Sequence, residues 1–338
     1  MKRLACPVCA SRVYFERTRC PACATELAFV PATSAMIRAE DAEALCQHRA
    51  VIQCNWTTEP DEPFCRACRL NRIVPNLSHE GNADRWQRIE RAKRRLIVDV
   101  LRLGLPIVSR TDDQINGLTF DLVSNLLTLA PIRTGHENGL ITLDIAEADD
   151  DVREARRAAL REPYRTLLGH FRHEIAHYYF TQLVENRPVL AAFRAIFGDE
   201  RQDYDQALQN HYQYGAPSDW REHFITAYAS CHPWEDWAET FAHFLHIVAT
   251  LDTAIETSLV GRDASIAEDA YRDPDFDRLI AAFRPLTEAI NEINRSMGVA
   301  DIYPFVLTPS VIGKLHFVHL VVRQATVPAE PVSPALTL

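Results

Sequence analysis

The chain has 338 residues, enough for about two domains, and its 47% hydrophobic and 24% charged residues are ordinary for a globular protein. No apolar run approaches the roughly 18 residues of a membrane-spanning helix, and the N-terminus lacks the apolar stretch of a secretory signal. These features exclude an integral membrane protein, and we expect a cytoplasmic protein that has no membrane partner.

The formal net charge of −10 is unevenly distributed along the chain. Residues 1–103 contain 17 Lys and Arg against 12 Asp and Glu, a balance of +5, while the remainder carries −15. A basic region raises the hypothesis of nucleic-acid binding. If eight cysteines in this region hold two zinc ions as thiolates, its charge falls to about +1. The charge therefore does not favour a nucleic-acid partner.

Eight of the nine cysteines lie before residue 69, and in a reducing compartment such cysteines favour metal binding over disulfides. Two C-x2-C pairs separated by ten residues predict a zinc ribbon whose ligands are Cys6, Cys9, Cys20 and Cys23. Ala10 and Ala24 follow the two pairs at a position where φ is commonly positive and glycine is favoured. We therefore expect slightly strained turns there.

A second set of cysteines predicts a second zinc site, with the ligands Cys46, Cys54, Cys65 and Cys68. Only the last two have the close spacing of a zinc knuckle, and His48 is an alternative ligand in place of Cys46. Sites with four protein ligands leave no position for water, so both are expected to be structural. A region with so little apolar core needs such metal sites to fold.

A helical region with a few strands is predicted to follow the cysteines. The apolar periodicity of residues 84–103 predicts a helix that ends at Gly104. Acidic residues 149–151 suit the first turn of another helix. Between them, two short runs predict strands, at residues 118–123 and 139–146. The second strand is either an ordinary core strand or the sheet edge that pairs with an extended peptide.

A long helix is predicted to begin near Pro163 and to carry the segment His173-Glu174-Ile175-Ala176-His177. The two histidines are four residues apart, so both imidazoles lie on one helix face and can reach one metal ion. The carboxylate of Glu174 can then reach a metal-activated water molecule and act as its general base. A chance match in a chain with 13 histidines is the competing interpretation.

A helix from Pro233 to about Leu251 offers a third ligand. Glu235 and Glu239 lie one turn apart on the same face of an otherwise aromatic helix, where unpaired burial of both carboxylates would be costly. A zinc ion for one and an imidazole N–H for the other would satisfy both. Glu235, Glu239 and His243 are therefore alternative third ligands, and a pair of solvated carboxylates is the competing interpretation.

The remaining C-terminal sequence predicts two more helices and a proline-rich disordered tail, at residues 275–297, 310–324 and 326–338. The fold class expected is α+β. The predicted domains are a cysteine-rich zinc-ribbon region at residues 1–75 and a mainly helical, zincin-like metallohydrolase domain with a short sheet at residues 82–322.

These motifs resemble those of known metallopeptidases. HExxH followed by E-x-x-A-E on a second helix is similar to the glutamate-type zincins, including the lethal-factor-like toxin peptidases. The stretches CNW…FCRACRLN, EPYRTLLGHFRHEIAHYYF and AYASCHPWEDWAETFAHFLH resemble, over nearly the whole chain, a bacterial family called "putative zinc-binding metallo-peptidases", which has an N-terminal zinc ribbon. The resemblance implies that Glu235 is the third zinc ligand and that Glu239 orients a ligand histidine. Tyr228, seven residues before Glu235, matches a tyrosine of the toxins.

The function predicted is that of a zinc metallopeptidase with one catalytic and two structural zinc ions, acting on a peptide or protein. Tyr228 is either a hydrogen-bond donor to the developing oxyanion or an ordinary interior tyrosine. One alternative is a non-catalytic protein whose ribbon binds a protein or nucleic acid on a zincin scaffold, and another is a hydrolase of a different bond. Glu174 favours the enzyme, because a scaffold needs no general base. The ribbon is then a module for a substrate or a protein partner.

Overall fold

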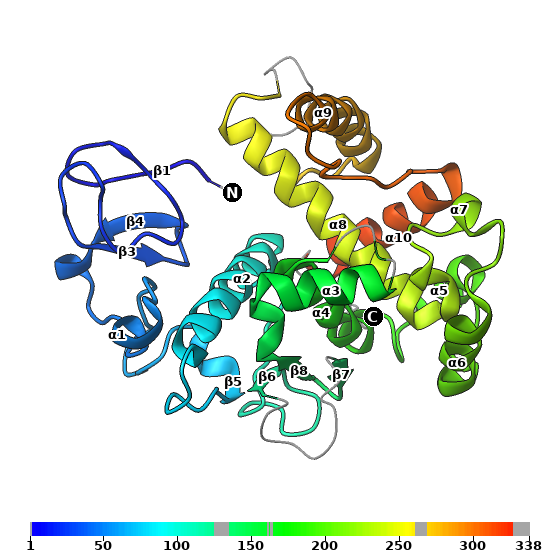
Figure 1. Ribbon diagram of the computed structural model, residues 1–338, viewed down its shortest axis with the longest axis horizontal. Coiled ribbons are helices and arrows are strands. Elements are labelled where there is room, and N and C mark those ends of the chain that lie inside the picture. The colour runs from blue at the N-terminus through cyan, green and yellow to red at the C-terminus, as the bar shows by residue number, and fades with distance from the viewer. Residues whose placement is uncertain (1, 125–134, 161, 163–164, 261–268, 327–338) are drawn as a thin grey trace, which may run out of the picture.

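The computed structural model describes residues 2–124, 135–160, 162, 165–260 and 269–326 (Figure 1). Over these residues the fold is α+β, mainly helical with small sheets, which confirms the predicted class. No helix in the described ranges is long and apolar enough to cross a membrane. Thr326, assigned above to the tail, is the last residue of a helix, and residues 327–338 lie outside the described ranges.

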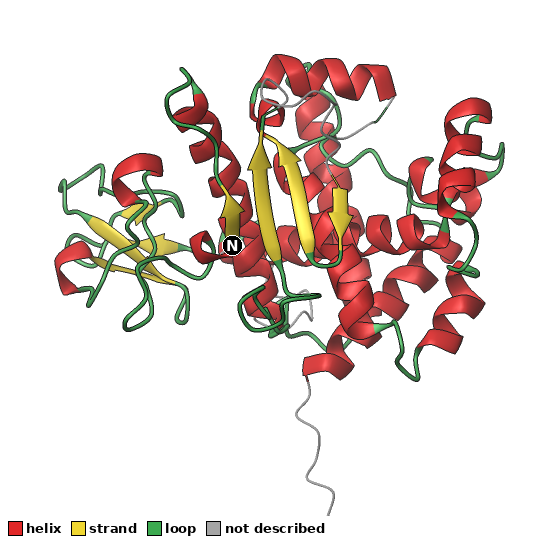
Figure 2. Cartoon of the chain, turned by 90° about the horizontal axis from the view of Figure 1, so that it is seen from below, coloured by secondary structure: helices red, strands yellow, loops and turns green. Residues whose placement is uncertain are grey.

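The cysteine-rich region forms a small body at one end of the molecule (Figure 2). Its core contains Phe15, Phe29 and Trp56, whose rings contact one another at centroid distances of 4.9 to 6.3 Å. The elements around this core are two antiparallel strand pairs and short helices: β1 (Leu4–Ala5), β2 (Arg12–Val13), β3 (Leu27–Val30), β4 (Ala35–Arg38), η1 (Ala39–Asp41), α1 (Arg49–Ile52) and η2 (Cys68–Leu70).

A four-stranded sheet lies at the centre of the molecule (Figure 2). Its strands, in spatial order, are β5 (Asn71–Ile73), β6 (Thr119–Val123), β8 (Leu140–Asp144) and β7 (Gly135–Glu137). The strands predicted at 118–123 and 139–146 are confirmed as β6 and β8. β8 is paired on both sides, so the alternative of an ordinary core strand is confirmed and the hypothesis of an edge strand is wrong. Among the described strands, β5 and β7 form the two edges. A two-residue turn of Asn138 and Gly139, with φ values of 47° and 80°, produces this hairpin.

Helix α2 (Asn82–Leu103) joins the cysteine-rich region to the rest of the chain (Figure 1). It begins two residues before the predicted Asp84 and ends at Gly104, whose φ of 80° closes the helix in the left-handed conformation. Its face toward the centre of the molecule packs against α4 (Leu167–Leu183). Between them, the carboxylate of Asp99 accepts a hydrogen bond of 2.7 Å from the Arg172 guanidinium.

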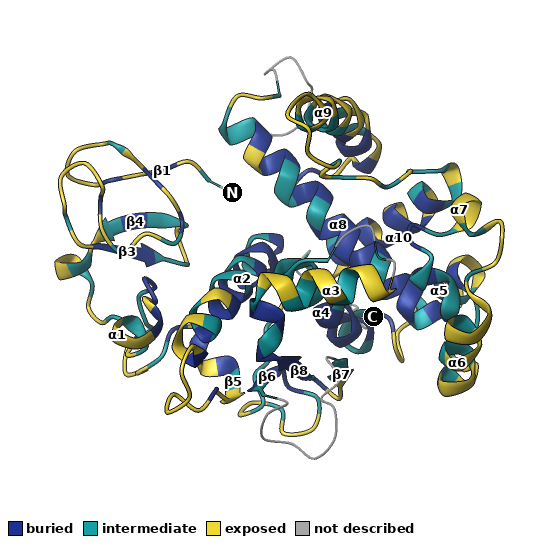
Figure 3. Ribbon diagram, viewed as in Figure 1, coloured by how far each residue is buried: buried dark blue, intermediate teal, exposed yellow. Residues whose placement is uncertain are grey.

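Helices α4 and α8 (Pro233–Glu256) form the most extensive helix pair of the described fold, and both are largely buried (Figure 3). The indole N–H of Trp237 on α8 donates to the carbonyl of Ala176 on α4 at 2.8 Å. α4 begins at Leu167, not near Pro163, which lies outside the described ranges. Thr166 is extended, and its hydroxyl accepts from the Gly169 amide at 2.9 Å, so this N-cap sets the helix start.

Further helices cover this pair and the sheet: η4 (Ile145–Ala148), α3 (Asp150–Leu160), α5 (Leu190–Phe197), α6 (Tyr204–Tyr214), α7 (Trp220–His223), η5 (Tyr228–Cys231), α9 (Phe276–Ser296) and α10 (Pro309–Thr326). α3, α9 and α10 lie where the sequence predicts helices. α5 and α6 are not predicted above, and α6 lies close to η5 on the approach to α8.

Candidate metal centres and active site

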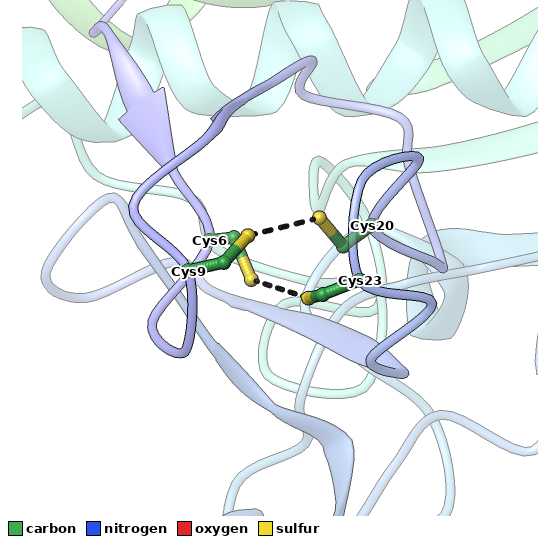
Figure 4. Close-up of side chains that lie close together, drawn as sticks. All are labelled: Cys6, Cys9, Cys20 and Cys23. Atoms are coloured by element: carbon green, nitrogen blue, oxygen red, sulfur yellow. Dashed lines mark hydrogen bonds between the residues drawn. The ribbon is translucent and has the colours of Figure 1, made fainter.

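The first four cysteines meet at the tip of two facing turns (Figure 4). The sulfur atoms of Cys6 and Cys23 lie 3.6 Å apart, and those of Cys9 and Cys20 lie 3.7 Å apart. A tetrahedral zinc ion with Zn–S bonds of about 2.3 Å separates its sulfur ligands by about 3.8 Å. The four thiols therefore fit a zinc ion, and the exposure of Cys9 and Cys23 leaves this first centre in contact with water.

Both turns of the first centre contain the strained alanine that the sequence predicts. Ala10 and Ala24 have φ values of 58° and 60°, and the amide of each donates to the carbonyl four residues earlier. Left-handed backbone costs an L-residue about 1–2 kcal/mol, whereas glycine adopts it freely. Both side chains are exposed, so the methyl groups gain little from packing, although the carbonyl of Ala24 also accepts a hydrogen bond of 2.8 Å from the Arg19 guanidinium.

Ala10→Gly and Ala24→Gly are each expected to stabilise the zinc-loaded protein by about 1 kcal/mol, because glycine relieves the left-handed strain. Chemical denaturation monitored by circular dichroism measures the gain. Ala22→Gly is the matched control, since Ala22 lies in the same exposed turn and is not among the positive-φ residues. Equal or negative effects at all three positions would contradict the expectation.

The second set of cysteines, Cys46, Cys54, Cys65 and Cys68, is gathered in the interior beside α2. The sulfur of Cys54 lies 3.7 Å from that of Cys65 and 3.9 Å from that of Cys68, again the spacing of a tetrahedral zinc site. The alternative ligand His48 is not part of the cluster. Its ring packs instead on Phe64 and Trp86, at centroid distances of 4.4 and 4.8 Å.

A third group of possible ligands joins α4 to α8. The Nε2 atoms of His173 and His177 lie 3.3 Å apart, and Oε2 of Glu235 lies 3.0 and 3.5 Å from them. Tetrahedral zinc with bonds of about 2.0–2.1 Å separates such ligand atoms by about 3.3–3.4 Å. Oε2 of Glu235 is buried and makes no hydrogen bond of ordinary geometry with a described residue. A divalent cation would satisfy this oxygen, so the three residues fit a zinc ion.

Glu239 lies on the outer side of His173. Its Oε1 lies 2.6 Å from Nδ1 of His173, and its Oε2 accepts from the Thr226 hydroxyl at 2.8 Å. A proton on Nδ1 leaves the lone pair of Nε2 directed toward the ligand group. Both oxygens of Glu239 therefore already have partners other than the ligand atoms of the group, and Glu239 is not one of the three grouped ligands. The other alternative ligand, His243, lies outside the group and has its Nδ1 2.8 Å from the Tyr303 hydroxyl.

The charge of this third group favours a cation. Although burial lowers the pKa of His173, the adjacent carboxylates of Glu235 and Glu239 raise it well above its usual value. Glu174 adds another buried carboxylate to the same space, and burial raises its pKa above the usual value. Several carboxylates in a buried site are stable only with compensating positive charge, which a divalent metal ion provides.

Two tyrosines border the ligand group. Tyr228, the first residue of η5, has its ring centroid 6.0 Å from that of His173, and burial raises its pKa well above the usual value. Its hydroxyl therefore keeps its proton. Tyr204, the first residue of α6, donates its hydroxyl to Oε1 of Glu235 at 2.7 Å. Tyr204 is not predicted from the sequence, because the local pattern of α6 gives no sign of its contact with Glu235, 31 residues later in the chain.

Two aromatic side chains contact the ring of His177, and neither is predicted from the sequence as part of the site. Trp234 on α8 lies with its ring centroid 4.1 Å from that of His177, and the ring of His136 on β7 stacks at 6.0 Å. Trp234 directly precedes Glu235 in the aromatic-rich sequence of α8, and this position could have predicted that Trp234 lies at the site. His136 is brought to the site only by the β7–β8 hairpin.

Comparison with known proteins covers both parts of the chain. A family model described as "Putative zinc-binding metallo-peptidase" matches residues 82–321, and one described as a zinc-ribbon domain matches residues 3–79. Proteins of Mycobacterium bovis and Mycobacterium tuberculosis, described as uncharacterized, are 42% identical over 336 residues, 98% of this chain and of theirs. No solved structure matches the chain.

Proposed function

The chain belongs to the "Putative zinc-binding metallo-peptidase" family, and from this membership we propose that it hydrolyses peptide bonds with a water molecule and Glu174 as general base. The observation that supports this proposal best is the group formed by His173, His177 and Glu235. The ligand atoms of these three side chains lie 3.0–3.5 Å from one another, a spacing that suits a catalytic zinc site with three protein ligands.

Zinc bound by this group supplies Lewis acidity, which polarises a carbonyl and lowers the pKa of a water molecule toward about 7. Glu174 lies next to His173 on the same helix, with 8% of its surface exposed. Its raised pKa brings the carboxylate closer to the range in which a base can both take a proton and return it. In the proposed reaction Glu174 accepts the proton of the water and then delivers it to the leaving amine.

The tyrosines have separate proposed roles. Tyr228 keeps its proton and is the candidate donor to the oxygen on which negative charge develops. Tyr204 holds Oε1 of Glu235, so that Oε2 alone is directed to the metal. Glu239 fixes the tautomer and orientation of His173, as carboxylates commonly do for metal-binding histidines.

The edge strand β7 offers a place for the substrate backbone. It is antiparallel to β8, lies near α4, and carries His136, which stacks on His177. An extended peptide that pairs with the side of β7 that no described strand covers would pass close to the ligand group. We therefore propose that substrates bind in extended conformation and lack stable secondary structure at the bond that is cleaved.

The proposal is tested by incubating the full-length protein with a peptide library derived from a proteome and identifying new N-termini by mass spectrometry. Cleavage should disappear after treatment with a zinc chelator and return with added zinc. Elemental analysis should give three zinc ions per chain, and two in His173→Ala. Cleavage that survives chelation, or an unchanged zinc content in His173→Ala, would exclude the proposed site.

Tyr204→Phe is expected to weaken zinc binding at the third group by about tenfold or more, because a hydrogen bond to a charged group contributes roughly 1.5–3 kcal/mol. Competition with a chromogenic chelator measures the affinity. Tyr212→Phe is the matched control, since Tyr212 lies on the same helix and is 62% exposed. Identical zinc affinities in the two variants would contradict the role given to Tyr204.

A further inference from the structure

Helix α2 carries a buried arginine whose guanidinium has no hydrogen-bond partner among the described residues. Arg94 is fully buried, and each of its three guanidinium nitrogens lacks a hydrogen bond to any residue that the structure describes. Buried polar groups almost always have partners, and a buried charge without compensation is still more costly. Such a side chain therefore requires an anion in its surroundings.

The anions near Arg94 belong to the second cysteine cluster. Although burial lowers the pKa of Arg94, the negative charges of Cys54 and then of Glu90 raise it above its usual value. Cys65 and Cys68 contribute in the same direction. The geometry agrees with this electrostatic picture. Arg94 lies one helical turn after Glu90, on the same buried face of α2, and Oε2 of Glu90 is 3.9 Å from the sulfur of Cys68. Arg94 therefore lies on the face of α2 that meets the cluster.

Without Arg94, the second cysteine cluster with its zinc ion would carry a net negative charge in the interior. Four thiolates and one Zn²⁺ carry −2, and all four cysteines are buried. Glu90, whose Oε2 is 3.9 Å from the sulfur of Cys68, adds −1, and Lys93, paired with Glu90 at 2.7 Å, removes it. Arg94 is a second buried cation on the same helix, and it reduces the net negative charge of this cluster from −2 to −1.

The first centre differs in its solvation. Cys9 and Cys23 are exposed there, so water can stabilise the charge of the zinc and its thiolates. The second centre has no exposed cysteine. A buried cation is therefore needed at the second centre and not at the first.

We propose that Arg94 is the counter-cation of the second zinc centre and that the centre is complete only when α2 supplies it. The cysteines come from the zinc-ribbon region, whereas Arg94 comes from the helix that packs against the HExxH-bearing α4. The metal and this arginine thereby stabilise each other across the junction of the two regions. The inference concerns a structural centre and does not depend on the proposed peptidase activity.

The test compares Arg94→Met, which removes the charge at similar size, with Arg94→Lys, which keeps it. Purified full-length protein is treated with a chelator and an alkylating reagent, and the modification of each cysteine is followed by mass spectrometry. Loss of partners that support metal ligands typically lowers metal affinity about 10- to 100-fold. Arg94→Met should therefore accelerate alkylation of the second set of cysteines by about that factor and leave the first set unchanged. Arg91→Met, on the same helix and half-buried, is the control.

The outcomes separate charge from packing. Arg94→Lys should protect the second set nearly as well as the natural arginine, and this variant decides the matter if Arg94→Met does not fold. Unchanged protection in Arg94→Met would overturn the proposal. Equal acceleration at both centres, or an Arg94→Lys protein that loses protection or fails to fold, would show that shape rather than charge is required and would overturn it as well.

Discussion

Replacement of Glu174 by glutamine is expected to lower the rate of peptide cleavage by about 10²- to 10⁴-fold, the usual contribution of a general base. Glutamine has nearly the same shape but cannot accept the proton of the water. Glu174 is not one of the three grouped ligands, so zinc content should stay at the level of the unchanged protein. Cleavage of a library-derived peptide and elemental analysis of the same sample measure the two effects.

Glu185→Gln is a suitable control, because Glu185 is exposed just beyond the end of the same helix. It should retain full activity. An active Glu174→Gln protein would remove Glu174 from the mechanism, whereas an inactive protein that has also lost zinc would assign the residue a structural role instead.

Cys54→Ser is expected to destabilise the protein by more than about 4 kcal/mol, the range reached when a mutation removes a bound metal. Cys54 is fully buried among the other cysteines of the second centre, so its loss leaves three thiols and the guanidinium of Arg94 in the interior. Zinc content should fall by one ion per chain, and thermal unfolding monitored by circular dichroism should shift to lower temperature.

Cys9→Ser provides the comparison at the exposed first centre. We expect a smaller loss of stability there, because water can solvate the remaining thiolates and no buried cation is left without its anion. If both serine variants unfold at the same temperature, burial of the second centre contributes nothing beyond the loss of metal.

Much of the fold follows from local sequence pattern. The apolar periodicity of residues 84–103 and Gly104 predict α2 almost to its ends, and the strands at 118–123 and 139–146 occur as β6 and β8. The start of α4 is missed because Thr166, the residue that caps it, is less conspicuous than Pro163. Whether 139–146 is a core strand or an edge strand stays open at the level of sequence, because strand order depends on pairing between segments, which alternation within one strand does not encode.

The candidate site divides in the same way. His173 and His177 follow from helical spacing, and the helix that becomes α8 offers three candidates for the third ligand: the carboxylates of Glu235 and Glu239 and the imidazole of His243. The residues alone leave this choice open, and the family resemblance implies Glu235. The crossing of α4 and α8 brings Glu235 beside the two histidines and places Glu239 beside the far side of His173. The roles of Tyr204 and Arg94 cannot be predicted from local sequence patterns, because each resembles an ordinary helix residue and the groups on which its role depends lie in other elements.

Strand β5 is a small element with a consequence for how this protein can evolve. It follows the last cysteine of the zinc ribbon, yet it pairs in parallel with β6 and forms one edge of the central sheet. Excision of the ribbon with β5 would uncover the backbone of β6, a surface prone to intermolecular pairing. Recombination that moves the ribbon to another gene would therefore leave β6 unpaired, unless another strand replaced β5. The two halves are expected to be inherited together, as their joint presence in the mycobacterial relatives illustrates.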